Sequence, residues 1–126
     1  MTNEIIISNA ADLIRLSASD VLAIKAAGNY CLLYLSDGNE HLVTYQLGQV
    51  EQMLSRQLGS AAATFIRIGR GLIINQEYLF VINLPKQQLI VRSFDKVQQE
   101  FSPPKEALRE LKQYIEKRIK NEQTNE

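Results

Sequence analysis

Two arginines and two glycines interrupt the apolar segment FIRIGRGLIIN, which runs from Phe65 to Asn75. Arg70 lies between Gly69 and Gly71. Glycine lacks a Cβ, so the backbone around Arg70 can turn sharply and approach a phosphodiester closely. A guanidinium held there can fork onto guanine O6 and N7 or clasp a phosphate. By itself, an arginine in a glycine-rich turn is more often exposed without any ligand, so the pattern raises a polyanion contact as a hypothesis.

The other polar residues of the segment favour structural roles. If Phe65 and Ile66 begin a strand, Arg67 shares a face with Phe65, and its aliphatic stem can cover the sheet while its head reaches solvent or a carboxylate. We expect this structural role ahead of a phosphate contact by Arg67. Asn75 ends the second apolar run, where we expect it to hydrogen-bond the local backbone and fix the following turn rather than touch a base.

Strands must position most of these residues, because β-branched and aromatic residues recur in short runs bounded by turn chemistry. The expected strands are Glu4–Ser8, Leu13–Ser17, Val21–Ala26, Tyr30–Leu35, His41–Tyr45, Phe65–Ile68, Leu72–Asn75, Phe80–Leu84, Leu89–Phe94 and Val97–Phe101. The alternation within Val21–Ala26 is typical of a half-buried strand. Ser36–Asn39 and Pro85–Gln88 supply the turns of two hairpins.

Two segments have apolar residues at helical spacing. Leu47–Leu58 is the first, and Gly59 stands where a left-handed cap would end it. The second follows Ser102-Pro103-Pro104, with Ser102 as the expected N-cap and Pro103 at the first helical position. Its apolar stripe consists of Leu108, Leu111, Ile115 and Ile119. Between the first helix and the central segment, we expect residues 60–63 to form a flexible connection.

The composition is that of one ordinary globular domain. Of 126 residues, we expect 1–120 to form the domain and 121–126 a polar tail. No apolar run approaches the ~18 residues that a membrane span needs, and the start, MTNEIIISNAAD, lacks the basic end and apolar centre of a signal peptide. Cys31 is the only cysteine, which suits a reducing compartment. We therefore expect a cytoplasmic protein with no membrane partner.

The net charge is zero, but the charges are unevenly distributed along the chain. Residues 1–55 contain two basic and six acidic residues, whereas residues 56–96 contain six basic and two acidic ones. The middle of the chain is therefore basic, and it includes Arg70. Sequence segments need not become surface patches, so chance fluctuation and a basic binding patch both stay open.

No residue pattern favours an enzyme. A nucleophile needs a base within hydrogen-bond reach, and His41 is the only histidine. Cys31 lies in an apolar strand, where a buried and inert thiol is expected. The sequence contains no H-E-x-x-H, C-x-x-C or phosphate-loop motif. We predict no catalytic residue, no metal and no cofactor.

The order of features resembles the LytTR family of bacterial DNA-binding domains. Gly28-Asn29-Tyr30 resembles the family's GNY-type turn, and Phe65, Arg67, Arg70 and Asn75 match the spacing of its F-x-R-x-H-R-S-x-x-V-N segment. The resemblance runs from Leu13 to Tyr114. It implies a mostly β fold, α+β at its margins, of elongated stacked β-sheets with one short internal helix and a C-terminal helix. It also implies sequence-specific binding of double-stranded DNA by loop side chains in major grooves, and hence transcription regulation.

Partners follow from the same resemblance. Family members commonly follow a receiver domain and bind as dimers to direct repeats at promoters. The resemblance therefore implies double-stranded DNA, a homodimer, and an upstream histidine kinase or receiver domain of two-component signalling. Nothing here resembles a receiver domain, so we expect either a free-standing regulator or a fragment of a longer response regulator.

The resemblance implies a DNA-binding set of Asn29, Arg67, Gly69, Arg70 and Lys105. The amide of Asn29 can bond bidentately to adenine N6 and N7, although an asparagine tolerated in a left-handed turn explains it equally well. Lys105 would replace a family arginine as a point charge. Gly69 and Gly71 stand where the family has histidine and serine, and both changes remove side chains that could meet phosphate.

A second function stays open beside DNA binding. A LytTR-like domain that has lost its DNA contacts could serve as a dimerisation or partner-docking module, with the apolar stripe of the C-terminal helix as its interface. We expect that stripe to pack first on the chain's own sheets. Salt-dependent DNA binding separates the two functions.

Overall fold

The structure is a computed structural model that describes residues 3–124, with side chains through residue 121. It consists mostly of strands in three antiparallel sheets, with two α-helices, which confirms the predicted fold class. The strands are β1 (Glu4–Ser8), β2 (Leu13–Ser17), β3 (Val21–Ala27), β4 (Tyr30–Leu35), β5 (Glu40–Val43), β6 (Phe65–Ile68), β7 (Leu72–Asn75), β8 (Leu79–Asn83), β9 (Gln88–Arg92) and β10 (Gln98–Phe101). The helices are α1 (Leu47–Leu58) and α2 (Lys105–Thr124), and short 3₁₀ turns span Ala18–Asp20, Gly59–Thr64 and Gln76–Tyr78.

A five-stranded sheet in the order β5-β4-β3-β7-β6 divides two hydrophobic cores. The first core joins one face of this sheet to α1 and the β1–β2 hairpin, and the second joins the other face to β8–β10 and α2. Residues Val21–Ile24 of β3 are therefore all buried, with Ile24 in the first core and Leu22 in the second. The prediction of a half-buried strand was wrong for this stretch, because a strand covered on both faces is apolar throughout.

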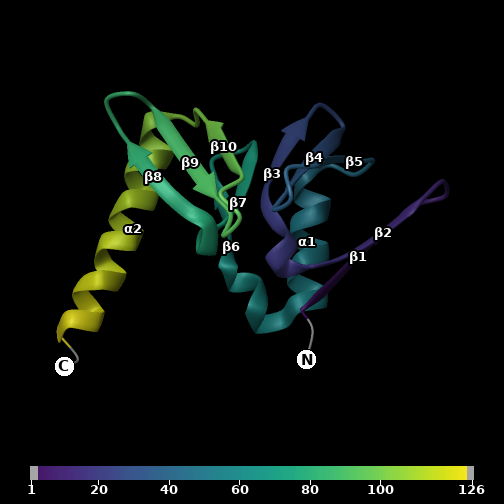
Figure 1. Cartoon of the computed structure of the whole chain (residues 1–126), viewed down its shortest axis with the longest axis horizontal. Helices are drawn as coiled ribbons and strands as arrows, with labels where there is room; N and C mark the ends of the chain where they lie inside the picture. The colour runs from purple at the N-terminus through teal and green to yellow at the C-terminus, as the bar shows by residue number, and fades with distance from the viewer. Residues whose placement is uncertain (1–2, 125–126) are drawn as a thin grey trace.

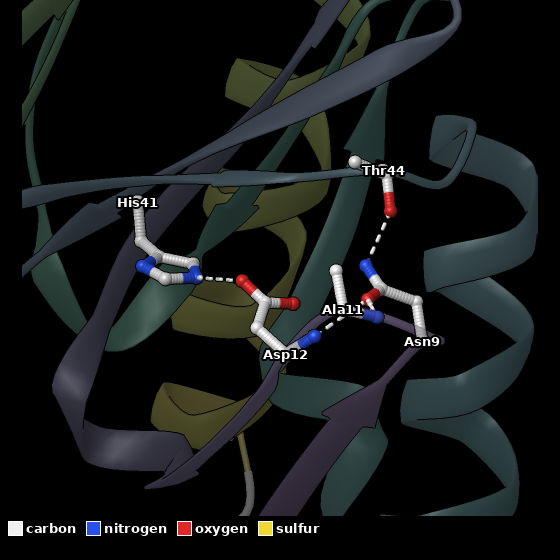
Figure 2. Close-up of polar contacts among 5 residues, drawn as sticks. All are labelled: Asn9, Ala11, Asp12, His41 and Thr44. Carbon is white, nitrogen blue, oxygen red and sulfur yellow. Dashed lines mark hydrogen bonds and ion pairs between the residues drawn. The ribbon is translucent and has the colours of Figure 1, made fainter.

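Side chains from neighbouring elements hold the β1–β2 hairpin in place. The amide of Gln57 on α1 accepts from the Ile6 N–H at 2.7 Å and donates to the Ile6 carbonyl at 2.8 Å, so it pairs with β1 as a neighbouring strand would. Figure 2 shows the other attachment, where Asn9 donates to the Thr44 hydroxyl and Asp12 lies 3.9 Å from His41 Nε2. The hairpin is therefore tied to both α1 and the end of β5.

Helix α1 has the predicted bounds. Leu47, Val50, Leu54 and Leu58 are buried at helical spacing, and Gly59 has a φ of +57° with its N–H bonded to the Ser55 carbonyl. The segment after Gly59, which we expected to be a flexible connection, forms a 3₁₀ turn instead. Cys31 is fully buried in the first core, as expected, and burial raises the pKa of its thiol. The thiol is therefore protonated at neutral pH.

Helix α2 begins at Lys105, so the predicted start at Ser102 and Pro103 was wrong. The ring of Pro104 disfavours helical backbone at Pro103, and the Pro103 carbonyl instead accepts from the Gln87 amide at 3.0 Å. The Pro104 carbonyl accepts the first helical bond, from the Leu108 N–H at 3.1 Å. The helix continues through Thr124, into the segment predicted as a polar tail.

The apolar stripe of α2 packs mostly on the chain itself. Leu108 and Leu111 are buried in the second core and Ile115 packs partly against it, whereas the Ile119 side chain is 49% exposed. Figure 1 shows the C-terminal part of α2 projecting beyond the sheets. No helix among the described residues is both long and apolar enough to span a membrane.

Candidate nucleic-acid interface

Antiparallel pairing brings two predicted loops to the same end of the five-stranded sheet. Lys25 of β3 pairs with Leu72 of β7, and the Ala26 N–H donates to the Gly71 carbonyl at 2.9 Å. The turn at 28–29 follows β3 directly, and the loop at 69–71 precedes β7 directly. Both connections therefore lie along one edge, which is the upper edge in Figure 1.

The β6–β7 loop also contacts the start of α2. A Cβ built on Gly69 would lie 3.8 Å from Ala107 Cβ and 3.9 Å from Pro104 Cδ. An open groove of about 790 Å³ separates the loop from the β10–α2 junction, and Arg70 and Lys25 are among the residues that line it. We call this end of the strands the loop edge; it consists of the 28–29 turn, the 69–71 loop, the 84–87 turn and the 102–105 junction.

Arg70 and Arg67 differ sharply in their surroundings. Arg70 is exposed, and no described side chain forms an ion pair or hydrogen bond with its guanidinium. Arg67 is engaged within the chain, since its Nη1 lies 2.8 Å from Glu51 Oε1 on α1 and its Nη2 donates to the Arg70 carbonyl at 2.8 Å. Arg67 therefore reaches a carboxylate, as its expected structural role requires, whereas Arg70 remains available to an external anion.

Asn29 is exposed at the tip of the β3–β4 turn. Gly28, with a φ of +66°, takes the left-handed conformation, and Asn29 is not among the described residues with positive φ. The explanation of Asn29 as a residue tolerated in a left-handed turn is therefore wrong. Its Oδ1 accepts from Gln46 Nε2 at 3.4 Å, a long and weak bond. The Asn29 side chain therefore contacts Gln46 at the start of α1 only weakly, and it is exposed.

Lys105 is the first residue of α2 and is exposed. Two further lysines of this edge were missed by sequence reasoning. Lys25 lines the same groove as Arg70. Lys86 is exposed in the β8–β9 turn, which Gln87 ties to the junction through the Pro103 carbonyl. Counting strand directions from the hairpin turns would have assigned both lysines to this edge.

Carboxylates gather at the opposite end of the strands. Burial raises the pKa of the Tyr78 hydroxyl, and the nearby carboxylates of Glu77, Asp20 and Asp95 raise it further. Each of these acids lies in a connection at the end of the strands opposite to the loop edge. Although the net charge is zero, acidic side chains therefore lie at the end of the strands opposite to Arg70 and the lysines of the loop edge.

The loop edge also contains acids. Glu106 is ion-paired within the chain, to Arg109 at 3.1 Å, whereas Glu100 is hydrogen-bonded to the neutral amide of Gln88 at 3.0 Å and keeps its charge. Glu110 lines the groove as well. An anion at this edge would therefore bind near Arg70 and the turn tips rather than deep in the groove.

Only one of the two glycines beside Arg70 has a conformation that requires glycine. Gly69 has a φ of +62°, whereas Gly71 is not among the glycines with positive φ and a Cβ there would meet nothing within 4 Å. Gly69→Ala should lower the free energy of unfolding by ~1 kcal/mol. Gly71→Ala, the matched control, should stay within about 0.5 kcal/mol of the parent. Urea denaturation measures the free energy of unfolding of both variants. Equal losses of stability would contradict the conclusion that only Gly69 has a conformation requiring glycine.

The fold and the loop edge together define a class of protein. Stacked sheets present cationic and amide side chains from loop tips, on the side away from a group of acids, which is an arrangement suited to a polyanion. Comparison with known proteins identifies the family within this class. The model of the LytTr DNA-binding domain family matches residues 11–116, so the chain belongs to this family.

A solved structure shows the same fold. The LytTr DNA-binding domain of a response regulator from Bacillus cereus is similar with a TM-score of 0.60 and 14% sequence identity, over 91% of this chain and 97% of that one. At that identity the likeness concerns the fold alone. Among curated proteins, no sequence matches this chain.

Proposed function

We propose that this chain is a sequence-specific, double-stranded DNA-binding module that regulates transcription, with loop-edge side chains entering major grooves. The observation that carries the proposal is the Arg70 guanidinium, which no described side chain binds, on the edge opposite to Asp20, Glu77 and Asp95. Duplex DNA is a dense line of negative charge, so a neutral protein of this polarity would approach it with the loop edge first.

Each loop contributes a different chemistry in this proposal. Arg70 forks onto guanine O6 and N7 or onto a phosphate, and Asn29 bonds to adenine N6 and N7. Gly69 lets the backbone approach a phosphodiester. Lys105, Lys25 and Lys86 contact phosphates as point charges, which fixes the register of the protein on the duplex without reading sequence.

The biological setting is part of the same proposal. We infer promoter direct repeats as targets, a homodimer as the bound form, and control by a receiver domain or histidine kinase in a bacterial cytoplasm. The support is membership in the LytTr family together with the Bacillus cereus domain, which belongs to a response regulator.

Binding to duplex DNA and its dependence on salt test the proposal. Pooled random duplexes should form a complex at low salt, with log affinity falling linearly against log salt by ~0.9 for each phosphate contact. Lys86→Gln, at the loop edge, should weaken binding and reduce that slope by about 0.9. The matched control is Lys96→Gln, which removes the same charge from the β9–β10 turn at the acidic end, and it should leave the slope unchanged. Fluorescence anisotropy at several salt concentrations measures both.

The docking-module alternative has one observation in its favour. Tyr114 and Ile119 of α2 are 47% and 49% exposed, and the end of α2 extends beyond the sheets (Figure 1). Absence of any complex with random duplexes at low salt would favour docking through this helix and contradict DNA binding. Equal effects of Lys86→Gln and Lys96→Gln would contradict the polarity on which the proposal depends.

A further inference from the structure

One guanidinium connects α1 to the loop that carries Arg70. Arg67 Nη1 donates to Glu51 Oε1 at 2.8 Å, Nε donates to the Gly69 carbonyl at 3.2 Å, and Nη2 donates to the Arg70 carbonyl at 2.8 Å. All three nitrogens are therefore engaged inside the chain. The Arg67 side chain is 32% exposed, so these bonds are partly shielded from water.

These bonds fix the direction in which Arg70 points. The carbonyls of Gly69 and Arg70 are both turned toward the Arg67 head, and the loop is thereby held at two consecutive peptide groups. A loop with a left-handed glycine and a second glycine nearby has many alternative conformations when it is not held. Ordering such a loop before binding reduces the entropy lost on binding.

We propose that Arg67 is a positioning residue for Arg70, and that Glu51 on α1 holds Arg67 in place. This inference rests on the proposed DNA binding by the loop edge. Arg67 does not contact phosphate in this arrangement; it acts through the loop whose carbonyls it holds. The body of the domain, through α1, thereby sets the geometry of its exposed arginine.

A double-mutant cycle separates positioning from direct contact. Arg67→Ala should weaken duplex binding about threefold to tenfold, which corresponds to the cost of ordering a loop on binding. The salt slope should not change, because no phosphate contact is lost. In an Arg70→Ala background, Arg67→Ala should have no further effect. A fall in slope of about 0.9, or the same loss in both backgrounds, would show a separate phosphate contact and overturn the inference.

For Glu51→Gln, electrostatics and loop positioning predict opposite changes in DNA affinity. The change removes a negative charge, so electrostatics alone predicts equal or tighter DNA binding. Weaker Arg67 anchoring predicts looser binding, and we expect a loss of about twofold to fivefold. Glu116→Gln is the matched control, because Glu116 pairs with Lys112 at 2.9 Å on the exposed side of α2, and it should not weaken binding. Unchanged or tighter binding by Glu51→Gln would overturn the role of α1.

Arg67→Lys keeps the charge, but one ammonium nitrogen replaces the three guanidinium nitrogens that reach Glu51 and the carbonyls of Gly69 and Arg70. It should bind DNA as weakly as Arg67→Ala, whereas rescue by lysine would indicate a simple phosphate contact and overturn the inference. Circular dichroism and thermal unfolding of every variant confirm that binding is measured on folded protein. Failure of the parent protein to bind any duplex would overturn the proposed function itself, whereas loss with Arg70→Ala but not with Arg67→Ala would overturn positioning alone.

Discussion

Arg70→Ala should weaken duplex binding by ~1–3 kcal/mol and leave the stability of the protein unchanged. The guanidinium is exposed and has no partner among the described side chains, so its removal breaks no contact within the fold. On the duplex, the same group would form two parallel hydrogen bonds to one guanine or one phosphate. Anisotropy titrations give the affinity, and urea denaturation gives the free energy of unfolding.

The form of the loss identifies the contact that Arg70 makes. A phosphate contact predicts equal weakening on all duplexes and a salt slope smaller by about one unit. A guanine contact predicts that the loss is confined to preferred sequences, which selection from a random duplex library would supply. The control is Arg15→Ala, which removes an exposed arginine paired with Glu4 at 3.1 Å on the β1–β2 hairpin. It should change neither the duplex affinity nor the salt slope. Full-strength binding by Arg70→Ala would contradict the loop assignment while leaving the class of protein intact.

Local patterns predicted the elements of this fold well where neighbouring residues determine the outcome. The α1 helix has its predicted bounds, since Leu47, Val50, Leu54 and Leu58 repeat at helical spacing and Gly59 can take the positive φ that ends it. The predicted start of α2 was wrong because the ring of Pro104 disfavours helical backbone at Pro103, and because the amide of Gln87, sixteen residues earlier, donates to the Pro103 carbonyl. Such a contact has no signature in the local sequence.

The sequence predicted the candidate site only in part, because contacts between distant residues also determine it. The resemblance to the F-x-R-x-H-R-S-x-x-V-N segment identified Arg67 and Arg70 together, but their different environments depend on Glu51, which lies on another element. Lys25 and Lys86 join Arg70 at one edge only through the directions of the strands that carry them. The charge polarity likewise arises from the antiparallel topology. Strand directions decide at which end of the sheets each charged turn lies, and composition does not specify those directions.

Asn75→Ala should destabilise the fold by ~2–4 kcal/mol, because it leaves several buried polar groups without partners. Asn75 is fully buried, and its Nδ2 donates to the Val21 carbonyl at 3.0 Å and the Ala18 carbonyl at 3.3 Å. Its Oδ1 accepts from the Thr64 hydroxyl at 2.7 Å and from the Glu77 N–H at 3.1 Å. The last bond confirms the predicted local role of Asn75, while the first two reach the start of β3.

This single amide therefore joins three connections at the end of the strands away from the loop edge. Removing it costs stability without touching the proposed DNA contacts, so Asn75→Ala that remains folded at low temperature should bind duplex with the parent's affinity. Asn39→Ala is the control, because Asn39 is exposed and its side chain bonds to Asp37 in a surface turn; its cost should stay below about 1 kcal/mol. Urea denaturation at several temperatures measures both variants. Equal stabilities of the two would show that the buried amide is not the joint between these connections.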